Sequence, residues 1–184
     1  MAAFEVLVDR YKQPVFNLVY RTLPDATEDE DLTQTVFVQV YKSASRYQAS
    51  AKFTTWLFTI ARNLCFNEIR RRSRHPAWSL DALVETNGEE LPRQFEDLNG
   101  FGPQESALQS ELEEKVNEVV RELPENQRTA LLLCSQEELS YENISDVLGC
   151  SLSATKSLIH RARETLKQRL KPYLRSGAWV AKAN

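Results

Sequence analysis

The sequence has 184 residues, of which 42% are hydrophobic and 27% are charged, and its net charge at pH 7 is -3. These values are typical of a globular protein with one domain or two small ones, and a total of only five glycines argues against a turn-rich β architecture. The sequence has no apolar run long enough to span a bilayer and no signal-peptide pattern, and its three cysteines and two histidines form neither a disulfide framework nor a metal motif, so we expect a cytoplasmic protein.

Basic residues are concentrated in two parts of the chain, although the chain as a whole is acidic. Residues 1–75 carry 11 basic and 8 acidic side chains, and residues 147–184 carry 8 basic and 1 acidic. Between these parts, residues 76–110 carry 1 basic and 7 acidic side chains. This asymmetry suggests that two surfaces of the protein contact nucleic acid.

Residues 1–75 are expected to form a helical domain. Its first helix is indicated by apolar residues at helical spacing, namely Phe4, Leu7, Val8 and Tyr11. Pro14 should interrupt or kink that helix. A second helix is predicted over residues 31–47. Its core-facing stripe consists of Leu32, Val36 and Val40, widened by Phe37 and Tyr41.

A third helix begins at Phe53 and ends among arginines, which occupy four of the five positions from 70 to 74. Its core-facing side consists of Leu57, Ile60, Ala61 and Leu64. The remaining faces mix aromatic rings, amides and arginines, at Trp56, Arg62, Asn63, Phe66, Asn67 and Arg70. Such a mixture suits unpaired bases and phosphates. The alternative is that the aromatic rings make a second contact with the core.

Residues 76–110 are expected to be a flexible acidic linker. They contain three prolines, three glycines and seven acids, and no sustained periodicity. A free coil of this length would span about 30–35 Å. The domains on either side could therefore lie well apart.

Residues 111–172 are predicted to form a second helical domain that contains a helix-turn-helix. Ser140 is suited to cap a short helix, and Gly149 is placed for the left-handed turn that ends it. Ser151 or Ser153 caps the next helix, whose inward residues are Leu152, Thr155, Ile159, Ala162 and Leu166. An exposed face of small, apolar and basic side chains there suits a DNA major groove. The alternative is a charged, solvated helix in a three-helix domain.

Four segments occur in an order that is more specific than any one of them: EDLTQTVFVQVY, FTTWLFTIARNLCFNEIRRR, LPENQRTALLL and LSYENISDVLGCSLSATKSLIHRARETLKQRL. Together they resemble bacterial RNA polymerase sigma factors of the extracytoplasmic-function (ECF) class over about residues 4–171. The resemblance implies an all-α protein of two small helical domains, at 1–75 and 111–172, joined by the linker at 76–110. The tail, residues 173–184, lies outside it and has no assigned role.

The function that the resemblance implies is not enzymatic. Such a protein binds core RNA polymerase through the β′ and β subunits and directs it to promoters. The first domain would recognise and open the minus-ten element, and the second would read the minus-thirty-five element. No catalytic residue, metal, cofactor or small-molecule substrate is implied. An anti-sigma factor is an expected further partner, in the cytoplasm or at the membrane.

Residue by residue, the resemblance assigns three sites. The polymerase-binding residues would be Asp31, Gln34, Thr35 and Phe37. The minus-ten DNA would be bound by Arg46, Lys52, Trp56, Arg62, Asn63, Phe66, Asn67, Arg70 and Arg71. The minus-thirty-five DNA would be bound by Ser153, Ala154, Lys156, Ser157, Leu158 and Arg161. Many relatives carry a basic residue where Leu158 stands, which leaves the preferred bases open.

Two other functions are consistent with parts of the sequence. A stand-alone helix-turn-helix regulator would bind a symmetric operator without polymerase, but the aromatic and arginine-rich helix would then have no role. A helical adaptor that binds only protein would show no salt-sensitive affinity for DNA. An enzyme is disfavoured because no phosphate loop, metal cluster or nucleophile motif is present in the sequence.

Overall fold

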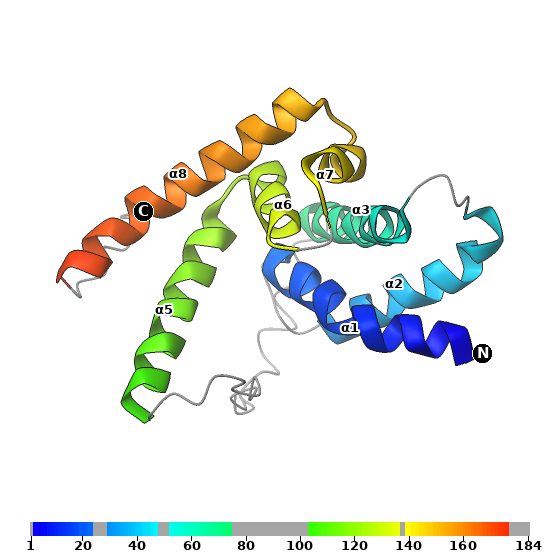
Figure 1. Cartoon of the computed structure of the whole chain (residues 1–184), viewed down its shortest axis with the longest axis horizontal. Coiled ribbons are helices and arrows are strands. Elements are labelled where there is room, and N and C mark those ends of the chain that lie inside the picture. The colour runs from blue at the N-terminus through cyan, green and yellow to red at the C-terminus, as the bar shows by residue number, and fades with distance from the viewer. Residues whose placement is uncertain (1, 24–28, 48–51, 75–102, 137–138, 177–184) are drawn as a thin grey trace.

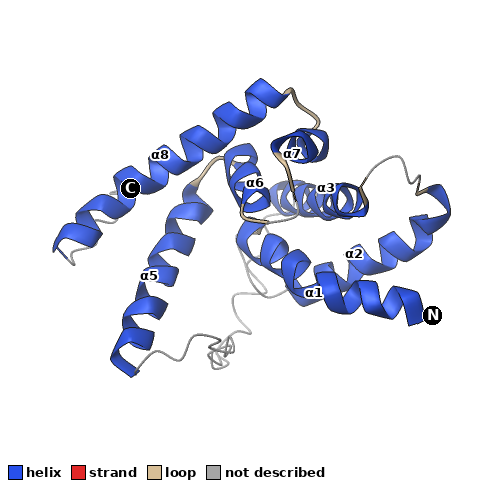
Figure 2. Ribbon diagram, in the orientation of Figure 1, coloured by secondary structure: helices blue, strands red, loops and turns tan. Residues whose placement is uncertain are grey.

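The computed structural model describes residues 2–23, 29–47, 52–74, 103–136 and 139–176, and every regular element in these ranges is helical (Figures 1 and 2). The first domain consists of α1 (Ala2–Thr22), α2 (Asp29–Ser43), a short 3-10 helix η1 (Ala44–Arg46) and α3 (Phe53–Arg74). The second consists of α5 (Pro103–Glu122), α6 (Glu125–Cys134), α7 (Tyr141–Leu148) and α8 (Leu152–Ser176). The all-α prediction is confirmed.

The core of the first domain contains part of each predicted stripe: Val36, Val40, Leu57 and Ala61 are buried, whereas Leu32, Ile60 and Leu64 are half-buried. Its fully buried side chains include Val15, Leu18, Val36, Leu57 and Ala61. The interruption considered at Pro14 does not occur, because α1 continues through that position. The kink considered there stays a prediction. A proline inside a helix removes one backbone hydrogen bond at a cost of about 3 kcal/mol. Burial of several large side chains on both sides of that position outweighs this cost.

The helix-turn-helix is built from local signals that the sequence displays. Ser140 Oγ accepts a hydrogen bond from the Asn143 amide at 3.2 Å, and Asn143 Oδ1 accepts one from the Ser140 amide at 3.4 Å, which makes a capping box. Gly149 ends α7 with φ of 66° and ψ of 36°, the left-handed conformation predicted for it. Ser151 rather than Ser153 caps α8, because its Oγ accepts from the Ala154 amide at 3.2 Å.

The boundaries of the second domain differ from those predicted. Helix α5 begins at Pro103, so residues 103–110 are helical and do not belong to a linker. Proline is favoured in the first turn of a helix, where its missing N–H has no partner to lose. Helix α8 continues to Ser176, four residues beyond position 172, where the second domain was predicted to end. The rest of the predicted linker, 76–102, and the tail at 177–184 lie outside the described residues.

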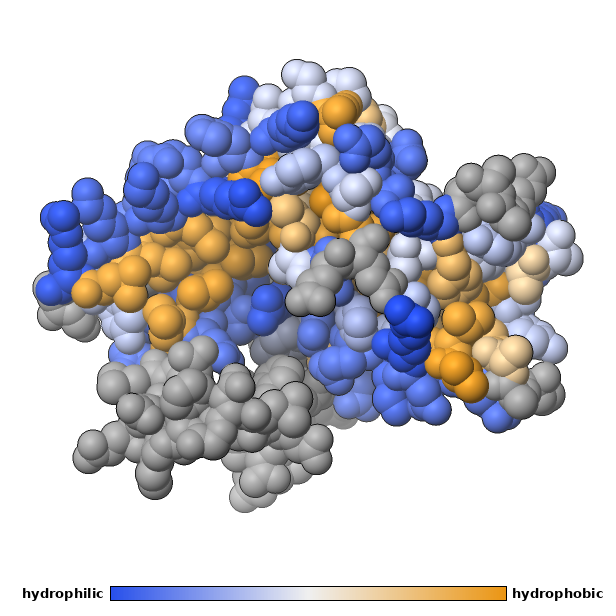
Figure 3. All heavy atoms as spheres, in the orientation of Figure 1, coloured by the Kyte–Doolittle hydropathy of each residue, from blue (hydrophilic) through white to orange (hydrophobic). Residues whose placement is uncertain are grey.

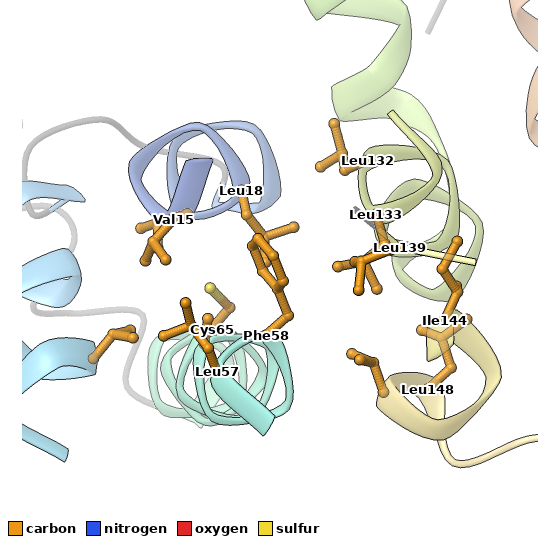
Figure 4. Packing of buried hydrophobic residues seen from close by; sticks show 14 of the residues in the cluster. Val15, Leu18, Leu57, Phe58, Cys65, Leu132, Leu133, Leu139, Ile144 and Leu148 are labelled. Carbon is orange, nitrogen blue, oxygen red and sulfur yellow. The ribbon is translucent and has the colours of Figure 1, made fainter. Parts of the chain in front are cut away.

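The two domains pack against each other instead of lying apart. Helix α7 lies beside α3 and helix α6 beside α1, and their buried residues form one continuous apolar cluster. Figure 4 shows Phe58 and Leu18 of the first domain facing Leu133 and Leu139 of the second. We call this contact the interdomain core.

A polar contact reinforces the interdomain core at the end of α1. The guanidinium of Arg128, in α6, donates hydrogen bonds to the backbone oxygens of Thr22, Arg121 and Leu123 at 2.5, 2.6 and 3.1 Å. Burial lowers the pKa of Arg128 from its ordinary value, although the group stays charged. Arg121 also lies over the ring of Tyr20, 5.3 Å from its centre. Arg128 thus joins a carbonyl of the first domain to two of the second.

Candidate functional site

The outer face of α3 carries four of the residues predicted to contact unpaired DNA. Trp56, Asn63, Asn67 and Arg70 fall on one side of the helix, away from the buried Cys65. Asn63, Asn67 and Arg70 are exposed, and Trp56 is half-buried. We call this side of the helix the outer face of α3. Its amides and its guanidinium are accessible to bases and phosphates.

An aromatic cluster holds Trp56 at the start of this face. Its ring centre lies 5.0 Å from that of Tyr47 and 5.9 Å from that of Phe53. Phe53 in turn contacts the ring of Tyr11 at 5.5 Å. Aromatic pairs at such distances add stabilisation beyond the area they bury, so the indole is a fixed and half-exposed platform. Arg46 and Lys52 are exposed on either side of residues 48–51, which lie outside the described residues.

Phe66 and Arg62 do not lie on the outer face of α3. Phe66 is only 7% exposed and belongs to the apolar cluster, and the guanidinium carbon of Arg62 lies 4.5 Å from the centre of its ring. Helix α3 packs against α7 as well as against α1 and α2, so its buried side is wider than the single stripe read from the sequence. In this structure Phe66 therefore belongs to the core, which was the alternative considered for the aromatic rings.

The positive charge at the arginine-rich end of α3 is partly neutralised by a glutamate of the same helix. Glu68 Oε2 accepts from Arg71 Nε at 2.8 Å, and Glu68 Oε1 accepts from Arg71 Nη2 at 2.8 Å and from Arg72 Nε at 2.7 Å. The bonds from Arg71, with a further contribution from Arg72, lower the pKa of Glu68 below its ordinary value, although partial burial opposes this. The carboxylate therefore stays ionised at neutral pH. Arg70 and Arg74, with Asn67 and Arg71, line an open hollow of about 320 Å³.

Replacing Glu68 with glutamine should strengthen binding to DNA of any sequence. The substitution removes the charge that neutralises Arg71 and Arg72, so this end of α3 can engage at least one more phosphate. For single-stranded DNA, the slope of log affinity against log salt should steepen by about 0.7. Fluorescence anisotropy over a salt series measures this slope. Glu118→Gln, which removes the ion pair of Glu118 with Lys115 in α5, is the matched control. An unchanged slope would contradict the expectation.

The first turns of α8 form a second open surface. Ser153, Lys156, Ser157 and Arg161 are exposed, and together with Leu152 and His160 they line a hollow of about 770 Å³. The predicted inward residues Thr155, Ile159 and Ala162 are buried. Ala154 and Leu158 are half-buried, and Leu158 packs against the apolar cluster, so both present less surface than the sequence indicated. The exposed set combines hydroxyl groups and cations at the start of a long helix.

The exposed face of α2 contains apolar residues that the sequence analysis did not assign to it. Asp31, Gln34 and Thr35 are exposed as predicted for a binding surface, whereas Phe37 is only 8% exposed and belongs to the core. Val38 and Tyr41 are 50% and 60% exposed.

Val38 could have been found from the sequence, because it lies four residues after Gln34 and seven after Asp31, on the same side of a helix. Tyr41 was expected to widen the core stripe, which is wrong. Its ring instead contacts Phe4 of α1 edge-on at 5.3 Å. Val6, also in α1, is 66% exposed, and Figure 3 shows apolar atoms on the surface where α1 begins.

Among the described residues, no group of three His, Cys, Asp or Glu side chains is placed to hold a metal ion. In the same part of the chain, no helix is long and apolar enough to cross a membrane. The surfaces that remain as candidates are therefore the faces of α2, α3 and α8, which present amides, hydroxyls, cations and a few apolar side chains.

Two family models match the chain, one in each domain. The model described as Sigma-70 region 2 matches residues 7–75, and the model described as Sigma-70, region 4 matches residues 113–166. The RNA polymerase sigma-H factor of Pseudomonas aeruginosa is 34% identical over 173 residues, which cover 94% of this chain and 89% of that protein. The ECF RNA polymerase sigma factor SigW of Bacillus subtilis is 34% identical over 170 residues, covering 92% of this chain and 89% of that protein.

Solved structures of similar fold extend the comparison to the arrangement of helices. The sigma factor RpoE, in complex with the anti-sigma factor NepR from Bartonella quintana, matches with a TM-score of 0.70 at 20% identity, over 93% of this chain and 98% of that one. CnrH, in complex with the cytosolic domain of CnrY, matches with a TM-score of 0.65 at 22% identity, over 93% and 89%. At these identities the likeness concerns the fold alone.

Proposed function

The chain belongs to the extracytoplasmic-function sigma factors of RNA polymerase, and we propose from this premise how its exposed faces share the work of initiation. The protein directs core RNA polymerase to specific promoters, which carry minus-ten and minus-thirty-five elements, and helps to open them. The observation that carries this function is the pair of family matches in order, region 2 over α1–α3 and region 4 over α5–α8, along most of the chain.

The face of α2 is the surface for core polymerase. Asp31, Gln34 and Val38 combine charge, an amide and an exposed apolar side chain on one side of a short helix. Specific interfaces usually combine a small apolar centre with a polar rim, and this face has that composition. Phe37 is left out of the proposed surface because it is buried in the core.

The outer face of α3 and the first turns of α8 are the two DNA surfaces. On α3, Trp56 offers a ring on which an unpaired base can stack, Asn63 and Asn67 offer amides to base edges, and Arg70 offers a cation to phosphate. On α8, exposed Lys156 and Arg161 flank small hydroxyl side chains, a composition suited to a major groove. The first surface would hold the melted minus-ten strand and the second the duplex at minus-thirty-five.

Two further properties follow from membership of this family. The protein has no catalytic role of its own, because initiation factors of this kind supply promoter recognition while polymerase supplies the chemistry. It works in the cytoplasm, where polymerase and DNA are. An anti-sigma factor is its proposed regulator, since the sigma factor RpoE, a protein of the same fold, was solved in complex with the anti-sigma factor NepR.

The decisive experiment is reconstituted transcription from a genomic promoter library, with core polymerase alone and with core polymerase plus this chain. We expect initiation at a defined set of sites only when the chain is present. If a duplex bound by the chain alone were the functional complex, as for a stand-alone helix-turn-helix regulator, adding the chain would alter existing initiation without creating new start sites.

A further inference from the structure

We propose that Arg62 is a positioning residue that orients the amide of Asn63, so that the outer face of α3 presents hydrogen-bond donors to one unpaired base. The base selected is then one that offers a keto oxygen, such as guanine or thymine, in preference to adenine, which has none. The inference rests on the proposed function of α3. It deepens that function by naming the base chemistry that Asn63 reads and by giving Arg62 a role other than binding phosphate.

The guanidinium of Arg62 lies over a buried aromatic ring. Its carbon lies 4.5 Å from the centre of the ring of Phe66, which is itself 7% exposed. The Arg62 side chain is half-buried, and its Nε is buried without a hydrogen-bond partner. Stacking on a buried ring restricts the guanidinium to one plane. A cation fixed in this way is poorly placed to contact a phosphate of bound DNA.

One nitrogen of this fixed group contacts the exposed amide beside it. Arg62 Nη1 donates to Asn63 Oδ1 at 3.3 Å. A guanidinium has no acceptor atom, so the amide atom that faces it must be the oxygen. The Asn63 NH2 group consequently points away from Arg62, toward the exposed side of α3 that also carries Asn67 and Arg70. The surface thus offers two N–H donors at this position, with the carbonyl turned aside.

This orientation decides which base edges Asn63 can bind. An asparagine that pairs with adenine uses both of its atoms, since its oxygen accepts from N6 while its nitrogen donates to N7. When the oxygen is turned toward Arg62, that two-bond pairing is lost. The outward donors are instead complementary to O6 and N7 of guanine or to O4 of thymine. One position of the melted strand should therefore favour guanine or thymine over adenine.

A randomised promoter library tests the proposal in reconstituted holoenzyme. The four proteins compared are the wild type and the variants Arg62→Ala, Arg62→Lys and Asn63→Asp, and the readout is the base preference at every promoter position. Asn63→Asp offers only acceptors, so it should reverse the preference at one position toward a base with an amino group, which identifies the position. At that position Arg62→Ala should reduce discrimination against adenine about five- to tenfold, the lower end of the range for one bidentate base contact. Arg62→Lys keeps a donor and should restore part of it.

The alternative role for Arg62 gives a different result. If Arg62 bound phosphate, Arg62→Ala would weaken initiation at all sequences alike and make the salt dependence shallower, as we expect for Arg70→Ala. That outcome, or an Asn63→Asp profile equal to wild type, would overturn the proposal. Thermal unfolding of each variant shows whether loss of the stack on Phe66 has unfolded the first domain. If Arg62→Ala has unfolded the domain, the base preferences of the Asn63→Asp and Arg62→Lys variants alone decide between the two roles of Arg62. Failure of the wild-type holoenzyme to initiate would instead refute the proposed function.

Discussion

Replacing Val38 with aspartate is expected to remove most of the affinity for core polymerase while leaving the fold intact. Val38 is 50% exposed at the centre of the α2 face that carries Asp31 and Gln34, so the substitution fills no cavity and buries no charge in the free protein. In the complex, the same carboxylate would be desolvated without a partner. Such a buried and unpaired charge at an interface costs about 2–5 kcal/mol, which corresponds to a loss of roughly 30-fold or more in affinity.

Two measurements separate binding from folding in this test. Affinity for core polymerase is measured by fluorescence anisotropy of the labelled chain. Stability is measured by thermal unfolding, and the free energy of unfolding should change by no more than about 0.5 kcal/mol for a surface substitution. Leu174→Asp is the matched control, because Leu174 is 66% exposed in α8 and lies in the other domain. Normal polymerase affinity for Val38→Asp, or an equal loss for Leu174→Asp, would remove α2 from the proposed interface.

In α2, the sequence predicts the centre of the buried stripe but not which residues at its edge are buried. Spacing by four correctly placed Val36 and Val40 in the core, because that signal depends only on helical geometry. It could not decide between Phe37 and Tyr41, which lie four residues apart on the same edge of the stripe. The tertiary packing decides this: Phe37 is 8% exposed and belongs to the apolar cluster, while Tyr41 remains 60% exposed beside Phe4 of α1. The burial of residues at the edge of an apolar stripe depends on which helices pack beside it, and the local sequence does not encode that packing.

The same distinction holds for the whole chain. The turn of the helix-turn-helix was predictable because Ser140 and Gly149 act within a few residues of their own positions. The interdomain core was not, because the apolar residues of each domain were already accounted for by that domain's own core. The contact between Arg128 and Thr22 joins residues 106 positions apart, and the spacing of residues along the sequence cannot predict such a contact.

If α3 and α8 bind the two promoter elements as proposed, promoter binding requires the two domains to separate. The minus-ten and minus-thirty-five elements are about 25 base pairs apart, which at about 3.4 Å per base pair is roughly 85 Å of duplex. A compact chain of this length has a radius of gyration of only about 16 Å. With α7 beside α3, one molecule cannot place α3 and α8 on both elements. We therefore expect the interdomain core to open when the holoenzyme binds a promoter.

Energy transfer between two dyes reports this opening. Gln13 of α1 and Asn126 of α6 are exposed on helices that lie side by side, and each can be replaced by a labelled cysteine once the half-buried Cys134 and Cys150 have been changed to serine. Transfer should be efficient in the free chain and nearly absent in the promoter complex. Efficient transfer in an active promoter complex would show that initiation proceeds with the domains closed.

Replacing Arg128 with methionine should open the free chain and strengthen its binding to polymerase. Of its three bonds to backbone oxygens only the one to Thr22 joins the two domains, so loss of the side chain weakens the closed state by about 1.5 kcal/mol. If only the open chain binds polymerase, the apparent dissociation constant falls as the open fraction rises, by up to about tenfold. Arg169→Met, which breaks only the pair with Glu122 inside the second domain, should leave both transfer and affinity unchanged. Reduced transfer with weaker polymerase binding would mean that the closed arrangement is the form that polymerase captures.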